Sequence, residues 1–180
     1  GEAPLAAYYL AWSRYRRGEY RPALEGFSRF STSYPDHDRA PEAAFYGAWS
    51  AFSLEEYLRA AELFAAYGEE GPRSETALLA RARALSAAGR GAEAILIAEE
   101  YLKLGSRATE KDQALFLIFQ VRLEAKDYGG SGAVLQRFAR EYPGSSWRGR
   151  ALYRQGRALL ADGRASEAAD FLDSYRSLYP

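Results

Sequence analysis

The residues best suited to acid–base or metal chemistry are few and scattered along the chain. His37 is the only histidine, and it stands between Asp36 and Asp38 in a turn where the three side chains could touch one metal ion. Asp favours turns for a simpler reason, because its carboxylate hydrogen-bonds the local backbone, and a structural zinc site needs four converging ligands. We therefore interpret His37 as part of a solvent-exposed loop and expect no metal and no cofactor.

Other candidate catalytic motifs are equally weak. Glu55-Glu56 and Glu69-Glu70 are adjacent carboxylates, but neighbours in sequence point in different directions on a helix and do not make an acid–base pair. Gly129-Gly130-Ser131-Gly132 has the glycine content of a phosphate-binding loop, but no Lys-Ser or Lys-Thr follows it. With no cysteine and one histidine, the sequence predicts a protein that is not an enzyme.

Large aromatic residues show a more regular pattern. Two sets recur at the spacing i, i+4, i+7: Tyr8, Trp12, Tyr15 and Phe45, Trp49, Phe52. On a helix each set shares one face, and Trp and Tyr are enriched among residues that dominate protein interfaces. Two interpretations stay open at this point, a core between packed helices and an exposed binding surface.

The composition and net charge of the chain indicate which kinds of partner it can bind. Of the residues, 48% are hydrophobic and 27% are charged, which predicts a folded chain, and the formal net charge is zero. A neutral chain lacks the general attraction to phosphates on which nucleic-acid binders depend, so we expect no nucleic acid. No segment approaches the roughly 18 uninterrupted apolar residues of a membrane span, so we expect at most a peripheral contact with a membrane.

A repeated phrase positions these residues. A turn containing Gly or acidic residues is followed by a small residue, a larger apolar residue and, in three repeats, a closing Tyr-Pro, as in Tyr34-Pro35, Tyr142-Pro143 and Tyr179-Pro180. Pro72 closes the second repeat. The small residues are Ala23, Ala60, Ala94, Ser131 and Ala168, so consecutive repeats are offset by 37, 34, 37 and 37 residues. This regularity indicates a repeat protein.

Each repeat reads as two amphipathic helices, because apolar residues recur at intervals of three and four on both sides of the turn. The predicted first helices are 4–16, 41–53, 75–88, 109–125 and 147–161. The predicted second helices are 20–33, 56–68, 91–104, 129–141 and 165–178. A small residue allows the two backbones of a pair to approach closely, and Pro ends the second helix.

The turn, the small residue after it and the closing Pro resemble the tetratricopeptide repeat family over nearly the whole chain. The resemblance implies an all-α, right-handed α-solenoid of about five helix-turn-helix units in one array over residues 1–180. The units would be 4–37, 41–74, 75–108, 109–145 and 147–180. The Tyr-Pro endings and the unit length look similar to bacterial envelope members, the periplasmic coordinator of the Tol-Pal system and the beta-barrel assembly lipoprotein. The lack of a polar capping helix implies a fragment of a longer protein, or an end that self-associates.

The resemblance also implies where a partner would bind. First helices of this family line a concave groove, so the two aromatic sets would face it, while Tyr9, Tyr20, Tyr46 and Tyr57 would lie in the core. Further along, the same surface would carry Arg83, Phe116, Tyr153 and Arg157. Ordinary solvated or ion-paired surface is the alternative for the two arginines. A clamp for a terminal carboxylate is not expected, because the family's clamp uses Asn and this sequence has none.

The leading functional hypothesis is therefore a scaffold that binds a peptide or partner protein, apolar with an acidic end, in a bacterial envelope complex. The expected location is the periplasm or cell envelope, with the cytoplasm as the alternative. A structural or oligomerising spacer within a larger polypeptide is a second hypothesis. Recognition of glycans by stacked aromatic rings is a third.

Overall fold

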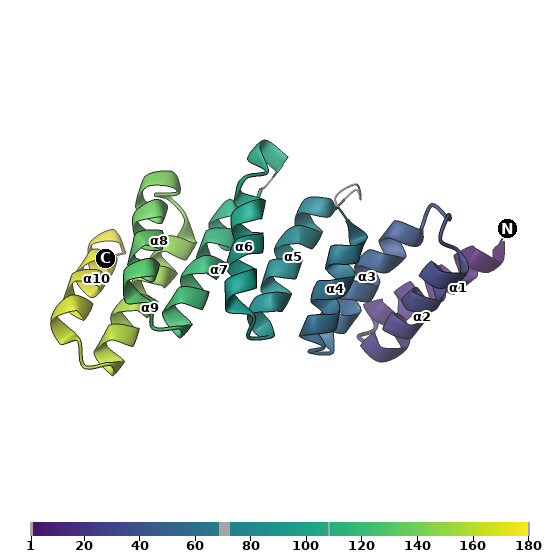
Figure 1. Cartoon of the computed structure of the whole chain (residues 1–180), viewed down its shortest axis with the longest axis horizontal. Helices are drawn as coiled ribbons and strands as arrows, with labels where there is room; N and C mark the ends of the chain where they lie inside the picture. Colours follow the sequence, from purple (N-terminus) through teal and green to yellow (C-terminus); the bar gives the residue numbers. More distant parts are fainter. Residues whose placement is uncertain (1, 69–72, 108, 180) are drawn as a thin grey trace. The chain divides into compact units, whose positions relative to one another are not determined.

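The chain folds into consecutive α-helices (Figure 1). The computed structural model describes residues 2–68, 73–107 and 109–179. Within them the elements are α1 (Glu2–Arg16), α2 (Tyr20–Ser33), α3 (Ala40–Ser53), α4 (Tyr57–Tyr67), α5 (Ser74–Ala87), α6 (Gly91–Leu102), the 3-10 turn η1 (Gly105–Arg107), α7 (Lys111–Glu124), α8 (Tyr128–Glu141), α9 (Ser146–Ala161) and α10 (Ala165–Leu178). Pro72, Pro180 and the Glu69-Glu70 pair lie outside the described residues.

The helix boundaries confirm the predicted pattern of paired helices, each end falling within two residues of its expected position. Two second helices, α2 and α8, end one residue before the tyrosine of a Tyr-Pro pair. Proline cannot donate the backbone hydrogen bond that would continue the helix, and it disfavours helical geometry in the preceding residue. The repeated Tyr-Pro therefore sets the length of these second helices.

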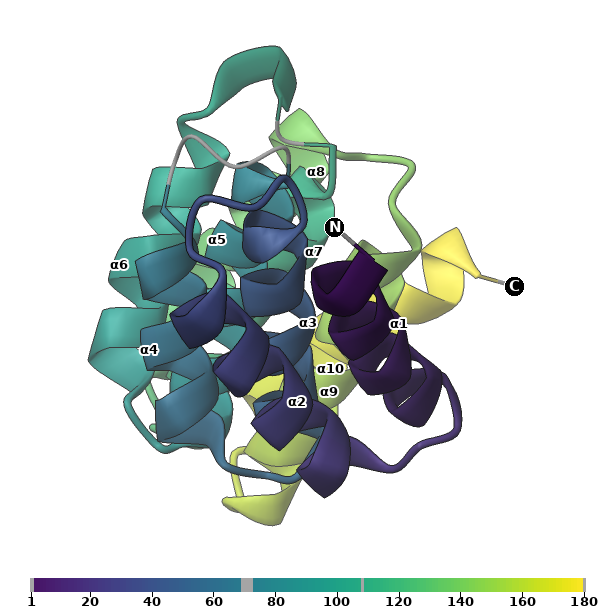
Figure 2. The ribbon, with the colours of Figure 1, turned by 90° about the vertical axis from the view of Figure 1, so that its right-hand side faces the viewer.

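The chain divides into two compact units, Gly1–Glu93 and Ala94–Pro180, with the boundary inside α6. In the N-terminal unit α1, α2, α3, α4 and α5 pack on one another in chain order, and the antiparallel pair of α1 and α2 is seen in the foreground of Figure 2. In the C-terminal unit α7, α8, α9 and α10 pack in the same order, and α7 also contacts α9. The organisation of both units as a single array stays a prediction.

The predicted register of the repeats is confirmed by burial. All five small residues that open the second helices are completely buried, at 0% exposure: Ala23, Ala60, Ala94, Ser131 and Ala168. Any larger side chain at these positions would have to displace a neighbouring helix, because protein interiors are close-packed. The small residue is therefore required by the geometry of the helix pair.

The turns inside the pairs share a left-handed residue at the same offsets. These residues are Gly18, Glu55, Gly89, Lys126 and Gly163, with φ of 77°, 62°, 76°, 57° and 76°. Glycine adopts this conformation without strain, whereas a side chain makes it costly. Two of the five turns therefore hold a non-glycine residue in an unfavourable conformation.

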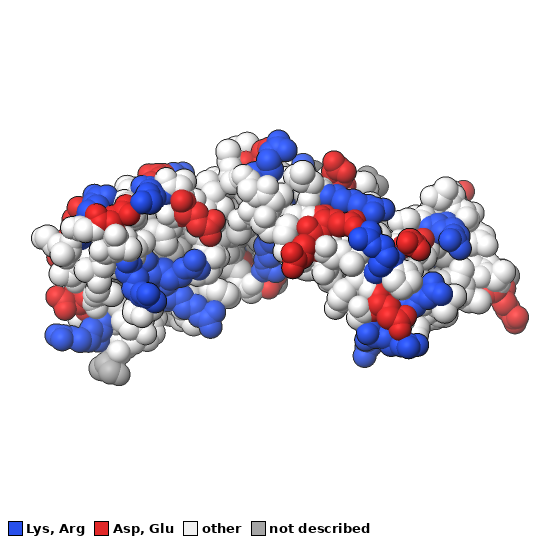
Figure 3. Space-filling view, turned by 90° about the horizontal axis from the view of Figure 1, so that it is seen from below, with Lys and Arg blue, Asp and Glu red and all other residues white. Residues whose placement is uncertain are grey.

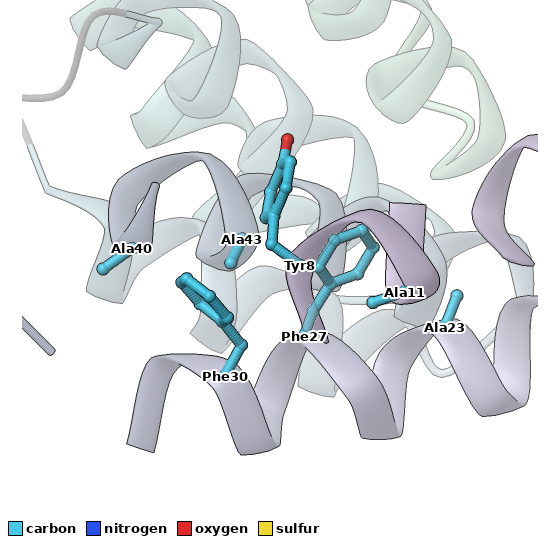
Figure 4. Packing of buried hydrophobic residues seen from close by; sticks show 7 residues of the cluster. All are labelled: Tyr8, Ala11, Ala23, Phe27, Phe30, Ala40 and Ala43. Carbon is cyan, nitrogen blue, oxygen red and sulfur yellow. The ribbon is translucent and has the colours of Figure 1, made fainter. Parts of the chain in front are cut away.

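The core of the first pair is built on aromatic rings (Figure 4). Phe27 and Phe30 of α2 point toward Tyr8 of α1, at ring-centroid distances of 6.1 and 5.7 Å. Ala11 and Ala23 complete the contact between the two helices, and both are buried. Edge and tilted ring contacts of this kind favour a fixed packing arrangement beyond the area they bury.

A buried polar pair lies between α8 and α9 in the C-terminal unit. The Ser131 hydroxyl on α8 donates a hydrogen bond of 2.8 Å to the Gln155 carbonyl oxygen on α9. The Gln155 amide donates in turn to the backbone carbonyl of Tyr128 at 3.4 Å. Gln155 is 1% exposed, so these bonds replace those that water would otherwise provide.

Candidate interaction surface

Three of the aromatic residues expected to face a binding groove are buried instead. Tyr8, Phe45 and Phe116 are 2%, 5% and 7% exposed. The expectation of exposure was wrong for them because the i, i+4, i+7 spacing also describes the face by which one first helix packs on its neighbours. They belong to the packing of the repeats.

Tyr8 illustrates what surrounds such a residue. The Arg39 guanidinium lies over its ring at 5.4 Å, and Arg39 pairs with Glu42 at 2.5 Å. Burial, and after it the nearby Glu42 carboxylate, raise the pKa of Tyr8 far above its ordinary value. The hydroxyl therefore keeps its proton throughout the physiological range and does not serve as a base.

Other members of the two aromatic sets lie at the edge of the core. Trp12 and Tyr15 of α1 are half-buried and pack against the core cluster of Tyr8 and Phe27. Trp49 and Phe52 of α3 are also half-buried, with their ring centroids 5.5 Å apart. These side chains each keep one side accessible, which is the arrangement that interface aromatics show.

Tyr9 was expected in the core and is 51% exposed, so that expectation is corrected. Tyr20, Tyr46 and Tyr57 are half-buried. Tyr9 shares the accessible face of α1 with Trp12, three residues later, and the Arg16 guanidinium lies over the Trp12 ring at 5.0 Å. The accessible face of α1 thus combines two aromatic rings with an arginine.

A second arginine of the N-terminal unit, Arg73, contacts residues of α3. Arg73, directly before α5, lies over the rings of Phe45 and Tyr46 at 5.2 and 5.5 Å. It donates a hydrogen bond of 3.4 Å to the Tyr46 hydroxyl and approaches Glu42 to 3.8 Å. Arg83 of α5 is half-buried. Arg39 and Arg73, which lie directly before α3 and α5, are thus each held over rings of the preceding first helix.

The C-terminal unit repeats this combination on α9. Tyr153 and Arg157, both expected at the surface, are exposed, and the guanidinium lies over the ring at 5.8 Å. The sequence reasoning missed three further residues beside them. Arg150 lies over Trp147 at 4.8 Å, and Arg154 lies over Phe116 at 5.9 Å. The rings of Phe116 and Trp147 are 4.7 Å apart.

A signal for these missed residues was present in the sequence. Arg150, Arg154 and Arg157 have the same i, i+4, i+7 spacing that drew attention to the aromatic sets. A search limited to aromatic residues passes over arginine, although arginine is also enriched at interfaces. We call Arg150, Arg154 and Arg157 the arginine stripe.

The groups first considered for catalysis have ordinary structural partners. The His37 ring is half-buried, not exposed as expected, with Phe30 at a centroid distance of 5.4 Å, and its Nδ1 accepts a bond from the Arg39 backbone N–H at 3.0 Å. The glycines after Asp127 begin α8, and the Asp127 carboxylate accepts a 2.8 Å bond from the Gly130 N–H. That bond, followed by the Arg122 side chain, lowers the pKa of Asp127.

Neither a metal centre nor a membrane span emerges from the part of the chain that the structure describes. No group of three His, Asp or Glu side chains within residues 2–68, 73–107 and 109–179 could hold a metal ion. No helix in those ranges is both long and apolar enough to cross a bilayer.

Comparison with known proteins identifies the repeat. The sequence model of the tetratricopeptide repeat family matches residues 5–37 and 150–180, which are the first and the last units. No protein of curated function matches the sequence.

Similar solved structures extend the likeness to the whole chain. The 41-end form of MamA from Desulfovibrio magneticus RS-1 has 15% identity and a TM-score of 0.74, covering 99% of this chain and 96% of that one. A tetratricopeptide repeat protein from Parabacteroides merdae has 11% identity and a TM-score of 0.74, covering 98% and 68%. A putative kinesin light chain with tetratricopeptide-like repeats from Podosopora anserina has 17% identity and a TM-score of 0.67, covering 96% and 92%.

These matches rest on shared architecture, since the identities are low. The ten paired helices of the described residues, the packing of α1 to α5 and of α7 to α10 in chain order and the small residue of each second helix all agree with that architecture. The chain therefore has the all-α fold of tetratricopeptide repeat solenoids.

Proposed function

We propose that the chain is a non-catalytic scaffold that binds a partner protein or peptide along the accessible faces of its first helices. Repeat solenoids of this kind in general present extended surfaces that bind other proteins. The observation that carries the proposal is the presence of accessible aromatic rings beside arginines on first helices of both units. Tyr9 and Trp12 with Arg16 on α1, and Tyr153 with Arg157 on α9, are the examples.

Such pairs are suited to protein recognition. Tyr and Trp provide large contact areas at a low cost in side-chain entropy, and arginine adds directional hydrogen bonds. The guanidinium groups of Arg16 and Arg157 already lie over the Trp12 and Tyr153 rings, so each pair is partly ordered before a partner binds. Binding at such preorganised groups loses less conformational entropy than binding at freely moving ones.

Site-specific photo-crosslinking tests the location of the partner surface. A photoreactive phenylalanine analogue is placed at Tyr9 or Tyr153 on first helices and, as matched controls, at Leu58 or Leu96 on second helices. All four positions are well exposed, at 51%, 44%, 50% and 68%. The variants are expressed in the source cell, irradiated, and analysed by mass spectrometry.

We expect the same protein to crosslink from the first-helix positions and not from the second-helix controls. Equal crosslinking from all four positions would show nonspecific contact. Crosslinking from Leu58 and Leu96 alone would place the binding surface on the second helices and refute the proposal.

The proposal extends to a bacterial envelope complex. Its support is the Tyr-Pro ending of the repeats, which is similar to that of periplasmic members of the family. Fractionation of source cells with an antibody against the chain tests it, and recovery in the cytoplasmic fraction alone would rule out the envelope.

A structural or oligomerising spacer is a second candidate, favoured by one observation. Leu160 on α9, Leu178 on α10 and the following Tyr179 are 48%, 42% and 42% exposed. Exposed apolar side chains at one end of a unit can bind a second copy of the chain. Sedimentation equilibrium of the native chain and Leu178→Glu tests this candidate. A monomeric native chain at micromolar concentration would refute self-association.

A further inference from the structure

The arginine stripe forms one line along α9. Successive residues of a helix rise by about 1.5 Å, so Arg150 and Arg154 are separated by about 6 Å along the axis, and Arg154 and Arg157 by about 4.5 Å. All three side chains are exposed, whereas Ala151, Leu152 and Gln155 between them are buried. The stripe is therefore the outward face of a helix whose other face packs in the unit.

Each guanidinium of the stripe rests on an aromatic ring. Trp147, Phe116 and Tyr153 lie under Arg150, Arg154 and Arg157 respectively, at centroid distances from 4.8 to 5.9 Å. A ring below the guanidinium restricts its orientation and leaves the N–H groups at its edge free to bind a ligand. The stripe thus presents three oriented sets of donors.

No acidic side chain neutralises the stripe within the described residues. None of its three arginines has a carboxylate oxygen within 4.0 Å, and α9 contains neither Asp nor Glu. Other arginines of the unit differ, since Arg137 pairs with Glu99 at 2.7 Å and Arg164 pairs with Glu167 at 2.7 Å. Figure 3 shows basic side chains gathered on the face of the C-terminal unit that is turned toward the viewer.

We propose that the arginine stripe binds an acidic peptide helix whose carboxylates recur at the spacing i, i+4, i+7. This proposal rests on the scaffold function and specifies the chemistry of the partner at the C-terminal unit. A guanidinium accepts a carboxylate through two parallel hydrogen bonds. A facing helix with the same spacing places its acidic side chains at both intervals of the stripe, whereas alternate residues of an extended strand lie about 6.6 Å apart and match the first interval better than the second.

A nucleic acid fits this surface less well than an acidic peptide. Binding to a phosphate backbone depends on basic residues that follow the strand over many nucleotides. The stripe covers only about 10 Å, and the neighbouring helix α10 carries Glu167, Asp170 and Asp173. The charge is therefore local, as expected for a short acidic segment.

Fluorescence anisotropy with the full chain tests the proposal. The probe is a fluorescein-labelled, alanine-based peptide of 15 residues with both ends blocked and Glu at positions 4, 8 and 11. A matched peptide carries Gln at these positions, and a ten-nucleotide single-stranded oligothymidylate represents nucleic acid. One variant replaces the three stripe arginines by Gln. The control variant replaces Arg140, Arg164 and Arg176 of the same unit by Gln, which changes the net charge equally.

We expect the stripe variant to bind the Glu peptide at least roughly tenfold more weakly than the native chain, since each exposed ion pair contributes a factor of about two, and bidentate geometry on an oriented guanidinium adds to it. The control variant should stay within about twofold, and the Gln peptide should bind weakly to all three proteins. An equal loss of affinity in the stripe and control variants would refute the proposal, because net charge alone would then explain the binding. Equal affinity for the Glu and Gln peptides would exclude carboxylate recognition. Stripe-dependent binding that is tighter for the oligonucleotide would assign the site to nucleic acid. Failure of the Glu peptide together with intact crosslinking at Tyr9 would overturn this inference and leave the scaffold function standing.

Discussion

Replacing Ser131 by Ala tests whether the buried polar pair of the C-terminal unit stabilises the fold. Alanine is the residue at the four equivalent positions, so a comparison of the repeats alone would call the change harmless. The structure predicts otherwise. The Ser131 hydroxyl donates to the Gln155 carbonyl oxygen at 2.8 Å, and both residues are buried, so Ala leaves that oxygen without its donor.

The expected cost follows from this geometry. A buried acceptor that loses its partner destabilises a protein by about 1–3 kcal/mol. The Gln155 amide keeps its bond to the Tyr128 carbonyl, so the side chain stays in place and relaxes little. We expect a loss of about 1.5 kcal/mol, which for a denaturant slope of about 2 kcal/mol per molar lowers the urea midpoint by about 0.7 M. Ser131→Ala combined with Gln155→Leu removes both polar groups and should cost less than the sum of the single changes.

Urea unfolding followed by circular dichroism measures these differences, and hydrogen exchange resolved by mass spectrometry assigns them to α8 and α9. Ser177→Ala on the exposed side of α10 is the control and should change stability by less than about 0.5 kcal/mol. Strict additivity of Ser131→Ala and Gln155→Leu would refute the reasoning. So would a Ser131→Ala protein as stable as the native one.

Three further changes probe other parts of the structure. Ala60→Leu at a completely buried position should overpack the second pair and cost about 1–3 kcal/mol in urea unfolding, and an unchanged midpoint would contradict the repeat register. Gly26→Ala places a methyl group 2.8 Å from the Ala11 Cβ, so α1 must shift, and a lower melting temperature is expected; a rise would show that the contact is loose. Burial raises the pKa of Tyr8 in the folded chain. The stability that the protonated Tyr8 contributes is therefore complete below its pKa of about 10 in the unfolded chain and is lost as pH rises above that pKa. The free energy of unfolding of the native chain should therefore fall more steeply between about pH 9.5 and 11 than that of Tyr8→Phe. Parallel curves for the two proteins would exclude this linkage.

The fold was predictable from the sequence because its signals are repeated. One Tyr-Pro or one buried alanine indicates little, but the same small residue at offsets of 37, 34, 37 and 37 fixes the register of every helix pair. Turn residues reinforce this register, since the left-handed position recurs at the same offsets. Division into two compact units was not predicted, because contacts between helices distant in sequence leave no periodic trace.

The candidate surface was harder to predict than the fold. Residues on first helices share their spacing whether they pack on the neighbouring helix or face outward, and a shift of one residue turns the side chain by about 100° around the helix axis. Tyr8 is buried while Tyr9 is half exposed for this reason. Arginine was underestimated in the same way. Its charge suggests solvated surface, but rings such as Trp147 hold the arginine side chains in place along α9.

The strained turn at Lys126 has a consequence for cooperativity between repeats. Its side chain reaches Asp162 at the end of α9, at 2.7 Å, and Tyr128 donates to the same carboxylate at 2.8 Å. Lys126 therefore has an unfavourable backbone conformation in the fourth repeat, and its side chain forms an ion pair with Asp162 of the fifth repeat. Repeat proteins unfold according to the intrinsic stability of each repeat and the coupling between neighbours. Lys126→Gly would therefore stabilise the fourth repeat itself and weaken its coupling to the fifth repeat.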